Sequence, residues 1–275
     1  MKKIFSILSV LMITAILVYI YARFVEPNLL TVHYETINTN LLRGSDEVRM
    51  LQFSDTHVSQ NFDIADLKKT VKKINEENPD IVVFTGDLID QYNNYEYKDS
   101  IYEIWEALGA IDAPYKFAVY GNHDYGGGAE KVYNEIMEKS GFVLLINENA
   151  ELSKLNLNFV GMDDSIFGSY EPDKVTSLMD QDMYNIVLSH EPDVADRFLE
   201  YNVDLFLSGH SHGGQVNLPV VSYQPALAEK YIRGFYYFDN LRQTKLYVNI
   251  GMGTSKIPLR FMAEPELSVI TLKSN

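Results

Sequence analysis

Five short polar segments in this chain of 275 residues each follow an apolar run that is typical of a buried strand. Because strand ends of one sheet meet at a common edge, side chains far apart in the sequence are expected to converge there. The segments contain five of the six histidines and are Asp55-Thr56-His57, Gly86-Asp87, Gly121-Asn122-His123-Asp124, His190, and Gly209-His210-Ser211-His212. The fold must therefore place five strand ends beside one another.

The first half of the chain alternates between strand and helix patterns. Strands are predicted at residues 30–37, 48–53, 81–84 and 117–120, and helices at 64–78, 100–108 and 129–140. Beyond residue 141, short strand patterns dominate, at 143–146, 155–160, 186–189, 205–208, 246–249 and 269–272. This order predicts an α/β fold in which two packed mixed β-sheets are flanked by helices.

An uncharged apolar segment occupies residues 4–22 near the N terminus. As a helix it would be about 28 Å long, which matches the hydrocarbon core of a bilayer. A cleaved signal peptide is the alternative, but its apolar region is usually shorter and ends at a small-x-small cleavage site. We therefore expect residues 1–29 to form an uncleaved signal anchor, or transmembrane helix, with a linker, and residues 30–275 to form one domain.

Charge indicates the orientation and the partners of that domain. Lys2 and Lys3 precede the apolar segment and Arg23 follows it, an excess of one positive charge that favours a cytoplasmic N terminus. We expect a single-pass protein of the cell membrane with an extracytoplasmic domain. Residues 31–275 carry 20 basic and 37 acidic residues, a net charge of −17, so no nucleic acid partner is expected. The chain has no cysteine, which excludes thiolate ligands and disulfides.

The polar segments offer oxygen and nitrogen ligands to metal ions. Asp55 and His57 lie two residues apart after an extended run, so their side chains are expected on the same side. Gly86 permits a sharp turn that lets the Asp87 carboxylate bridge two cations. Further ligands are expected from Asn122, His190, His210 and His212. This donor set suits manganese, iron or zinc, and we expect two divalent ions of one of these elements.

The expected pair of ions predicts a specific chemistry. Two divalent ions about 3.5 to 4 Å apart can bind a phosphoryl group and convert water to a hydroxide that attacks it in line. His123 is not needed to complete either ligand set, so it is expected to donate a proton to the leaving alkoxide. Asp124 is expected to orient His123 through a hydrogen bond.

These segments resemble those of the calcineurin-like metallophosphoesterases. The resemblance implies a double-sheet sandwich with a dinuclear centre and a proton-donating role for His123. It implies one metal held by Asp55, His57, Asp87 and His212, and another held by Asp87, Asn122, His190 and His210. Segments at 207–215, 231–236, 251–255, 258–261 and 265–267 are similar to the bacterial YkuE and YaeI-like phosphodiesterase branch. The resemblance covers residues 30–272.

The function expected on this basis is that of a membrane-anchored, dinuclear phosphodiesterase. Anchorage near the bilayer favours a phospholipid or a nucleotide-linked lipid or envelope precursor as substrate. A phosphomonoesterase or phosphoprotein phosphatase is the enzymatic alternative, although no basic docking surface is evident. A further alternative is not an enzyme: a noncatalytic module that retains the fold and binds a component of the cell envelope. Turnover of a phosphoester separates these hypotheses.

Overall fold

The computed structural model describes residues 2–96, 98–218 and 224–275, whose strands form two six-stranded sheets. The first sheet has the order β1 (Thr31–Thr39), β12 (Glu266–Ser274), β2 (Glu47–Phe53), β3 (Ile81–Phe84), β4 (Tyr115–Ala118) and β5 (Val143–Leu144). The second has the order β10 (Gly234–Tyr237), β11 (Lys245–Val248), β9 (Leu205–Ser208), β8 (Tyr184–Leu188), β7 (Leu157–Gly161) and β6 (Glu148–Leu152). Two mixed sheets are what the sequence predicts.

Parallel pairing brings the polar segments to one edge of each sheet. Strands β2, β3, β4 and β5 run parallel, with Leu51 opposite Val82 and Val83 opposite Phe117. Strands β7, β8, β9 and β11 likewise run parallel to one another. The segments that follow β2, β3, β4, β8 and β9 therefore leave the sheets at carboxyl ends, where ligands commonly bind in α/β proteins.

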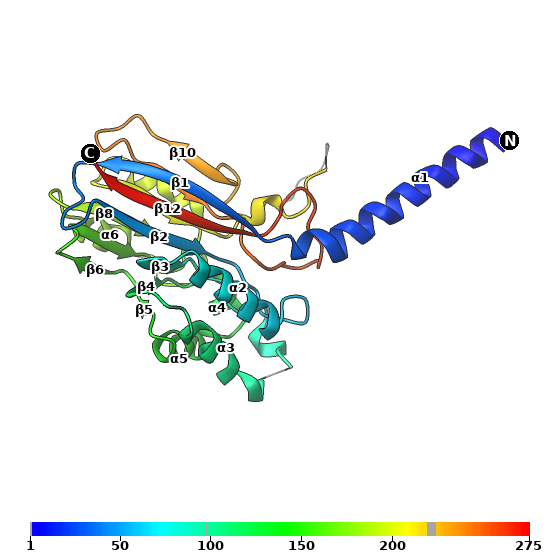
Figure 1. Cartoon of the computed structure of the whole chain (residues 1–275), viewed down its shortest axis with the longest axis horizontal. Helices are drawn as coiled ribbons and strands as arrows, with labels where there is room; N and C mark the ends of the chain where they lie inside the picture. The colour runs from blue at the N-terminus through cyan, green and yellow to red at the C-terminus, as the bar shows by residue number, and fades with distance from the viewer. Residues whose placement is uncertain (1, 97, 219–223) are drawn as a thin grey trace.

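Three apolar layers hold the sheets and helices together. Side chains between the sheets include Met50, Val83 and Leu207, and the rings of Phe117 and Phe159 stack with centroids 4.4 Å apart. The outer face of the first sheet is covered by α2 (Ile64–Glu76), α3 (Tyr102–Gly109) and α5 (Glu130–Lys139), as Figure 1 shows. The outer face of the second sheet is covered by α6 (Pro172–Ser177) and the 3-10 helix η5 (Pro192–Phe198).

Helix α2 shows how local sequence produces these layers. The carboxylate of Asp63 accepts hydrogen bonds from the backbone of Ala65 and Asp66 and so satisfies two donors at the helix start. Leu67, Val71 and Ile74, at the predicted helical spacing, are buried against the first sheet. The predicted amphipathic helix is thus present from its first residue.

Two strands of the second sheet were not predicted. Strand β6 has the sequence Glu-Asn-Ala-Glu-Leu and β10 has Gly-Phe-Tyr-Tyr, and neither has a buried residue. Both are edge strands that pair antiparallel with one neighbour. Because an edge strand obtains its hydrogen bonds from that neighbour and buries little surface, its own apolar pattern is weak.

Helix α1 (Lys2–Ile20) extends away from the sheets (Figure 1). It continues through a π-helical turn, η1 (Tyr21–Val25), and a 3-10 turn, η2 (Glu26–Asn28), into β1. None of its described residues is buried, and by length and composition it could cross a membrane. Residues 4–20 of the apolar segment noted in the sequence therefore do not belong to the core.

Candidate metal centre

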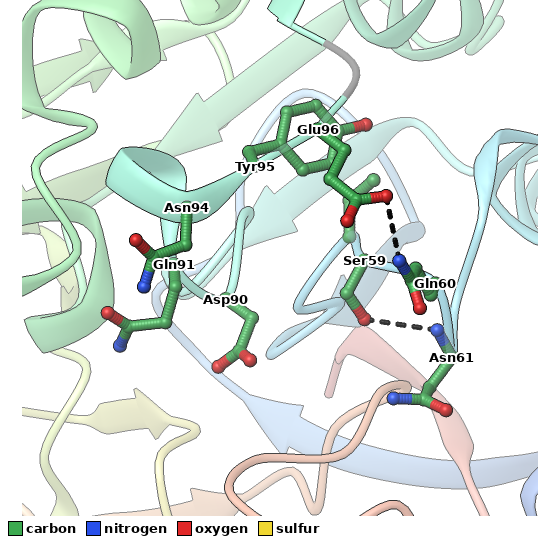
Figure 2. Close-up of a pocket in the computed structure, with 9 residues that line it drawn as sticks. Ser59, Gln60, Asn61, Asp90, Gln91, Asn94, Tyr95 and Glu96 are labelled. Atoms are coloured by element: carbon green, nitrogen blue, oxygen red, sulfur yellow. Dashed lines mark hydrogen bonds between the residues drawn. The ribbon is translucent and has the colours of Figure 1, made fainter.

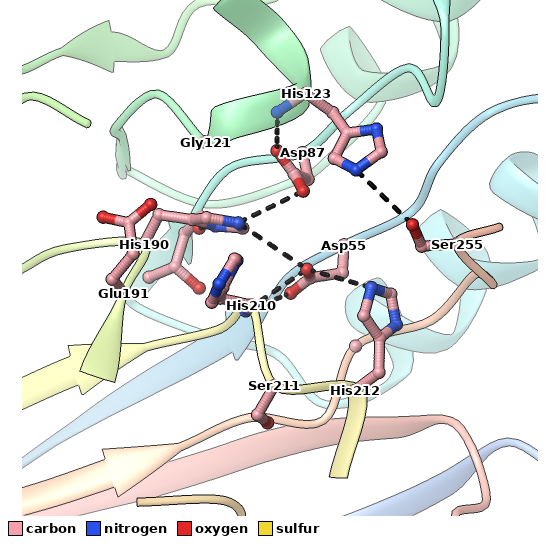
Figure 3. Close-up of polar contacts among 12 residues, drawn as sticks. Asp55, Asp87, Gly121, His123, His190, Glu191, His210, Ser211, His212 and Ser255 are labelled. Atoms are coloured by element: carbon pink, nitrogen blue, oxygen red, sulfur yellow. Dashed lines mark hydrogen bonds and ion pairs between the residues drawn. The ribbon is translucent and has the colours of Figure 1, made fainter. Parts of the chain in front are cut away.

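The predicted site residues lie close to one another, and Figure 3 shows Asp55, Asp87, His123, His190, His210 and His212 among them. Asp55 and His57 follow β2, and Asp87 follows β3. Asn122, His123 and Asp124 begin the short helix α4 (Asn122–Gly126) after β4. His190 follows β8, and His210 and His212 follow β9. The two sheets thus contribute to one centre, with carboxylates from the first and imidazoles mainly from the second.

An unusual backbone conformation recurs at these residues. Five of the predicted ligands have positive φ: Asp55 (49°), His57 (43°), Asp87 (61°), His210 (68°) and His212 (49°). Positive φ is uncommon in residues other than glycine, costs conformational energy and tends to occur at functional sites. The expected extended backbone between Asp55 and His57 is therefore wrong, although Asp55 Oδ1 and His57 Nε2 still approach to 3.8 Å. Left-handed turns orient these side chains.

Two motif glycines leave room for ligand side chains. A Cβ atom at Gly121 would lie 2.3 Å from Asp87 Oδ1, and one at Gly209 would lie 2.4 Å from Asp55 Oδ2. Both separations are far below van der Waals contact, so a side chain at either position would displace a carboxylate. The glycines are required because the backbones of neighbouring loops approach the site closely.

Asp55, His57 and His212 form the first group of converging donors. The Nε2 atoms of His57 and His212 are 3.1 Å apart, and His212 Nε2 is 3.5 Å from Asp55 Oδ1. Two nitrogens that each lie at 2.0–2.1 Å from one ion would be roughly 3.0 to 3.4 Å apart. The spacing of this group fits a shared cation.

Asp87, His190 and His210 form the second group. His190 Nε2 lies 3.1 Å from Asp87 Oδ2. His190 Nδ1 is 2.7 Å from the Thr85 carbonyl, and His210 Nε2 is 2.8 Å from the Ala226 carbonyl. Because a carbonyl only accepts, these nitrogens donate, and the opposite ring nitrogens keep their lone pairs for a metal.

Buried atoms without partners provide an independent test of metal binding. Among the described residues, Asn122 Oδ1 is buried and has no hydrogen-bond partner, and the buried His190 Nε2 faces the carboxylate oxygens of Asp87 at 3.1 Å and Asp55 at 3.9 Å. Buried polar atoms are ordinarily paired, because an unpaired one loses its hydration without compensation. Both atoms belong to predicted ligands. The residues present therefore fit divalent metal ions.

The pKa shifts differ among the imidazoles of the site: burial lowers the pKa of His210 and His212, whereas carboxylates raise that of His57 and His190. Burial lowers the pKa of His57, but Asp55, Asp90 and Asp87 outweigh it and raise that pKa to about 10. Burial likewise opposes the charge on His190, yet Asp87 and Asp55 raise its pKa. In the ion-free protein, protons on these rings offset the carboxylates. A metal ion would have to displace those protons.

Metal binding is accordingly expected to release protons. Ligation requires neutral imidazole, and a raised pKa keeps His57 protonated below about pH 10, so affinity should increase with pH up to that value. Titration calorimetry with Mn²⁺ in buffers of different ionisation enthalpy, between about pH 6 and about pH 9, measures this release. His57→Ala should reduce the proton release, whereas His33→Ala, on the exposed side of β1, should not. A pH-independent affinity would contradict the prediction.

His123 is held by a residue that the sequence did not single out. Its Nδ1 is 2.7 Å from the Asp90 carbonyl and 3.2 Å from Asp90 Oδ1, while its Nε2 is 3.4 Å from Ser255 Oγ. Asp90 is separated from His123 by 33 residues, and a carboxylate three positions after Asp87 more often caps a loop. Only the tertiary structure shows its contact with the ring.

Asp124 has different partners from those predicted. Its carboxylate accepts hydrogen bonds from the backbone N–H groups of Asp87 (2.9 Å), Leu88 (3.0 Å) and Gly121 (2.9 Å). Asp124 thus ties the loop after β3 to the start of α4, while Asp90 provides the ring contact expected of Asp124. The physical reason is that a buried carboxylate at a helix start satisfies free backbone donors. Burial, and then Asp87, raise the pKa of Asp124 to about 7.

A cavity of about 250 Å³ opens onto the candidate centre. Asp87, Asn122, His123, His210 and His212 line its floor. Its wall includes the apolar side chains of Ile166, Phe167, Pro225 and Ala226. The cavity therefore combines a polar floor with an apolar wall.

The apolar wall is held in place by a network next to His190. Ser165 Oγ donates to Glu191 Oε2 at 2.6 Å. Asp164 Oδ1 accepts from the backbone of Ile166 (3.2 Å) and Phe167. Phe167 is 60% exposed, and a Cβ atom at Gly126 would lie 3.0 Å from its ring. The loop that carries Phe167 is therefore ordered by residues adjoining the centre.

A second cavity, of about 290 Å³, is lined in part by Asp90 (Figure 2). Its lining includes Ser59, Gln60, Tyr95 and Glu96, and Gln60 Nε2 donates to Glu96 Oε2 at 2.8 Å. None of the predicted metal ligands lines it. The cavity above Asp87 is therefore the better place for a reacting phosphoester.

Comparison with known proteins agrees with this geometry. The family model described as calcineurin-like phosphoesterase matches residues 48–214, which contain all of the predicted ligands. The chain belongs to the calcineurin-like phosphoesterase family. The resemblance noted in the sequence is thus confirmed, and membership identifies the protein as a metal-dependent phosphoester hydrolase.

Relatives extend the similarity beyond the matched core. The metallophosphoesterase YkuE of Bacillus subtilis is 38% identical over 100% of this chain and 96% of that protein. UDP-2,3-diacylglucosamine pyrophosphatase LpxG of Chlamydia trachomatis is 28% identical over 96% of this chain and 95% of that protein. Phosphodiesterase YaeI of Escherichia coli is 27% identical over 92% of each. The calcineurin-like family thus accounts for nearly the whole chain.

Proposed function

We propose that this chain is a membrane-anchored phosphodiesterase that uses two divalent cations and acts on a lipid-linked phosphoester. The position of Asp87 carries the proposal of two ions. Its Oδ2 atom is 3.5 Å from His57 Nε2 in the first donor group and 3.1 Å from His190 Nε2 in the second. A carboxylate between two donor groups is suited to hold an ion on each side.

The ligands divide between the two ions by proximity. Asp55, His57 and His212 would hold one ion, and Asp87, His190 and His210 the other. Asp87 would also contact the first ion, and the family resemblance assigns Asn122 to the second. Manganese, iron or zinc suits this set of nitrogen and oxygen donors. When bound, two such ions supply positive charge for the phosphoryl oxygens and activate water. The protein holds these donors in fixed positions and lines the cavity above them.

His123 is proposed to protonate the leaving alkoxide. Burial lowers its pKa, but Asp87 and a hydrogen bond with Asp90 outweigh that effect and raise the pKa above its usual value. A raised pKa favours the protonated ring, which is the form that a proton donor needs. Asp90 and Asp124 act as positioning residues, the first through the ring and the second through the backbone around Asp87.

A substrate with an apolar part is supported by the cavity wall and by the names of two relatives. Ile166 and Phe167 lie beside the polar floor, where the part of the substrate next to its phosphate would rest. One relative is named for a diacylglucosamine substrate and another as a phosphodiesterase. These observations favour a diester or a pyrophosphate bond over a phosphomonoester.

Membrane attachment through α1 forms part of the proposal. Residues 1–29 would serve as the anchor and linker, and residues 30–275 as the catalytic domain outside the cytoplasm. The uncharged stretch of α1 supports the span, and Lys2 and Lys3 support a cytoplasmic N terminus. Reporter fusions at the C terminus test the side of the membrane.

The decisive assay compares an aryl phosphodiester with the matching aryl phosphomonoester. The full chain in detergent should cleave the diester faster with added Mn²⁺ and lose activity with a chelator. Preference for the monoester would favour a phosphatase instead. No turnover of either substrate by protein that contains metal would point to a highly selective enzyme or to a binding module, and would count against the proposal.

Substitution of Phe167 tests the apolar wall. Phe167→Ala should lower kcat/KM roughly tenfold for diesters with a long acyl or aryl group, because it removes part of an apolar contact surface. Methyl-substituted diesters should be nearly unaffected. Tyr237→Ala removes an aromatic ring that is 70% exposed on β10 and is the matched control. Equal losses on both kinds of substrate would argue against recognition by this wall.

A further inference from the structure

The base of α1 is bonded to residues 257–263 of the domain, and Arg23 also donates to Asn61 Oδ1 at 2.7 Å. The carbonyl of Ala22 accepts a hydrogen bond from Arg260 N–H at 2.9 Å, and Glu26 Oε1 accepts one from Ala263 N–H at 2.6 Å. The rings of Tyr21 and Phe261 meet edge to face with centroids 6.4 Å apart. Ala22 and Glu26 are buried. The helix is therefore fixed to the domain rather than joined to it by a free linker.

Arg260 makes the attached segment rigid and links it to the candidate centre. Its side chain is fully buried, and its guanidinium donates to the carbonyls of Ile250 (3.0 Å), Gly253 (2.6 Å) and Ala263 (2.8 Å). The stretch from 250 to 263 is thus held as one piece. Ser255 and Lys256, in the same stretch, line the cavity above the proposed metal ligands.

The attachment sets the depth of this segment relative to a bilayer that contains α1. Ala22 is two residues beyond the end of α1, a rise of about 3 Å along a helix axis. The polar layer on each side of the hydrocarbon core is about 5 to 7 Å thick. A segment bonded to Ala22 therefore lies at the depth of the lipid headgroups.

Exposed apolar side chains lie within three residues of the bonded positions Ala22, Arg260 and Ala263. Ile257 is 50% exposed and Met262 is 63% exposed, on either side of the buried Arg260. Phe24, in the turn that follows α1, is 60% exposed. We call these three residues the juxtamembrane face. Exposed apolar groups grouped at the base of a hydrophobic helix fit a lipid surface, which continues the environment of that helix.

We propose that the juxtamembrane face enters the headgroup layer of the bilayer that holds α1, so that the candidate centre opens at the membrane surface. This inference rests on the proposed anchoring and deepens the proposed function. Ile257 follows Lys256 directly in the chain, so the lipid contact and the cavity wall are adjacent. A phosphoester in a lipid headgroup could reach the cavity while its acyl chains remain in the bilayer.

Fluorescent labels test this placement, because the chain has no cysteine and each introduced cysteine is unique. Ile257→Cys and Met262→Cys report on the juxtamembrane face. Ile13→Cys, in α1, reports on anchoring. Leu241→Cys is the negative control: Leu241 is 95% exposed and lies in a cavity wall with Asn275, at the end of the domain opposite α1 (Figure 1). Each full-length variant is labelled with an environment-sensitive dye and placed in nanodiscs of phosphatidylcholine.

Exchange of the lipid for brominated phosphatidylcholine should quench the labels at residues 13, 257 and 262 and leave the label at 241 unchanged. If the label at residue 13 is quenched but the labels at 257 and 262 remain unquenched, as at 241, the helix is anchored and the inference is wrong. No quenching at 13 would show that anchoring itself fails, and the inference would fail with it.

A functional measurement complements the labels. The double variant Ile257→Ser, Met262→Ser should lose roughly tenfold in the rate on a diester presented in the nanodisc, because two apolar contacts with lipid are removed. Its rate on a soluble aryl diester should equal that of the unmodified protein. An unchanged rate on the nanodisc substrate would count against the proposed contact.

Discussion

Asp87→Asn is expected to abolish metal binding and hydrolysis together. The Asp87 carboxylate lies between His57 and His190, 3.5 and 3.1 Å from their Nε2 atoms. Asparagine has nearly the same shape but no charge, so both donor groups would lose an anionic ligand. Asparagine also tolerates the left-handed backbone found here, at φ 61°. A loss of metal and activity would therefore not be explained by misfolding.

The expected size of this effect is a loss of roughly a thousandfold or more in kcat/KM, because metal-assisted charge stabilisation is worth several kcal/mol. Metal content by mass spectrometry of the purified protein and the rate on an aryl diester are measured on the same sample. Asp239→Asn, which changes an exposed carboxylate after β10, is the matched control. Full metal content with full activity would refute the role of Asp87.

His123→Ala is expected to retain metal and lose a factor of roughly 10² to 10⁴ in rate, the range of general acid catalysis. The His123 ring lines the cavity, and its side chain is 16% exposed, in contrast to the fully buried His57 and His190. Its Nδ1 is engaged by Asp90, which leaves Nε2 near the cavity and Ser255. Removal of the ring should therefore spare the two donor groups.

The dependence on the leaving group separates proton donation from a structural role. An alkyl diester needs a proton on its departing oxygen, whereas a nitrophenyl diester departs as a stable anion. The loss in His123→Ala should therefore be large for the first and small for the second. His33→Ala, outside the site, should change neither rate. Because His123 also lies within reach of His57 and Asp87, a loss of metal would instead identify it as a ligand.

Much of the fold follows from local pattern. The predicted strand at residues 81–84 coincides with β3, and the predicted helix at 64–78 begins where α2 begins. Both have strong apolar periodicity, and both face a core. The edge strands β6 and β10 were missed because their pairing depends on a neighbour distant in sequence. The apolar periodicity of a segment reflects how much of it is buried, and edge strands bury little surface.

In the candidate centre, too, some residues could be predicted from local sequence, whereas the roles of others depend on contacts with distant segments. Metal binding needs particular types of side chain, so Asp55, Asp87 and His190 could be picked out from the sequence as candidate ligands. Asp90 could not, because its role depends on a contact with a ring 33 residues away. Asp124 was assigned to that ring, yet it satisfies backbone donors that become free only where two loops meet.

By itself, the sequence determined the chemistry of this protein: which side chains can bind metal, that they follow strands, and that a long apolar helix precedes the domain. Those properties reside in residue type and spacing. Tertiary structure alone decided the left-handed turns that aim the ligands, the contact of Asp90 with His123, and the attachment of Ala22 to Arg260. Each of these depends on backbone groups from distant segments, whose meeting no local pattern of side chains encodes.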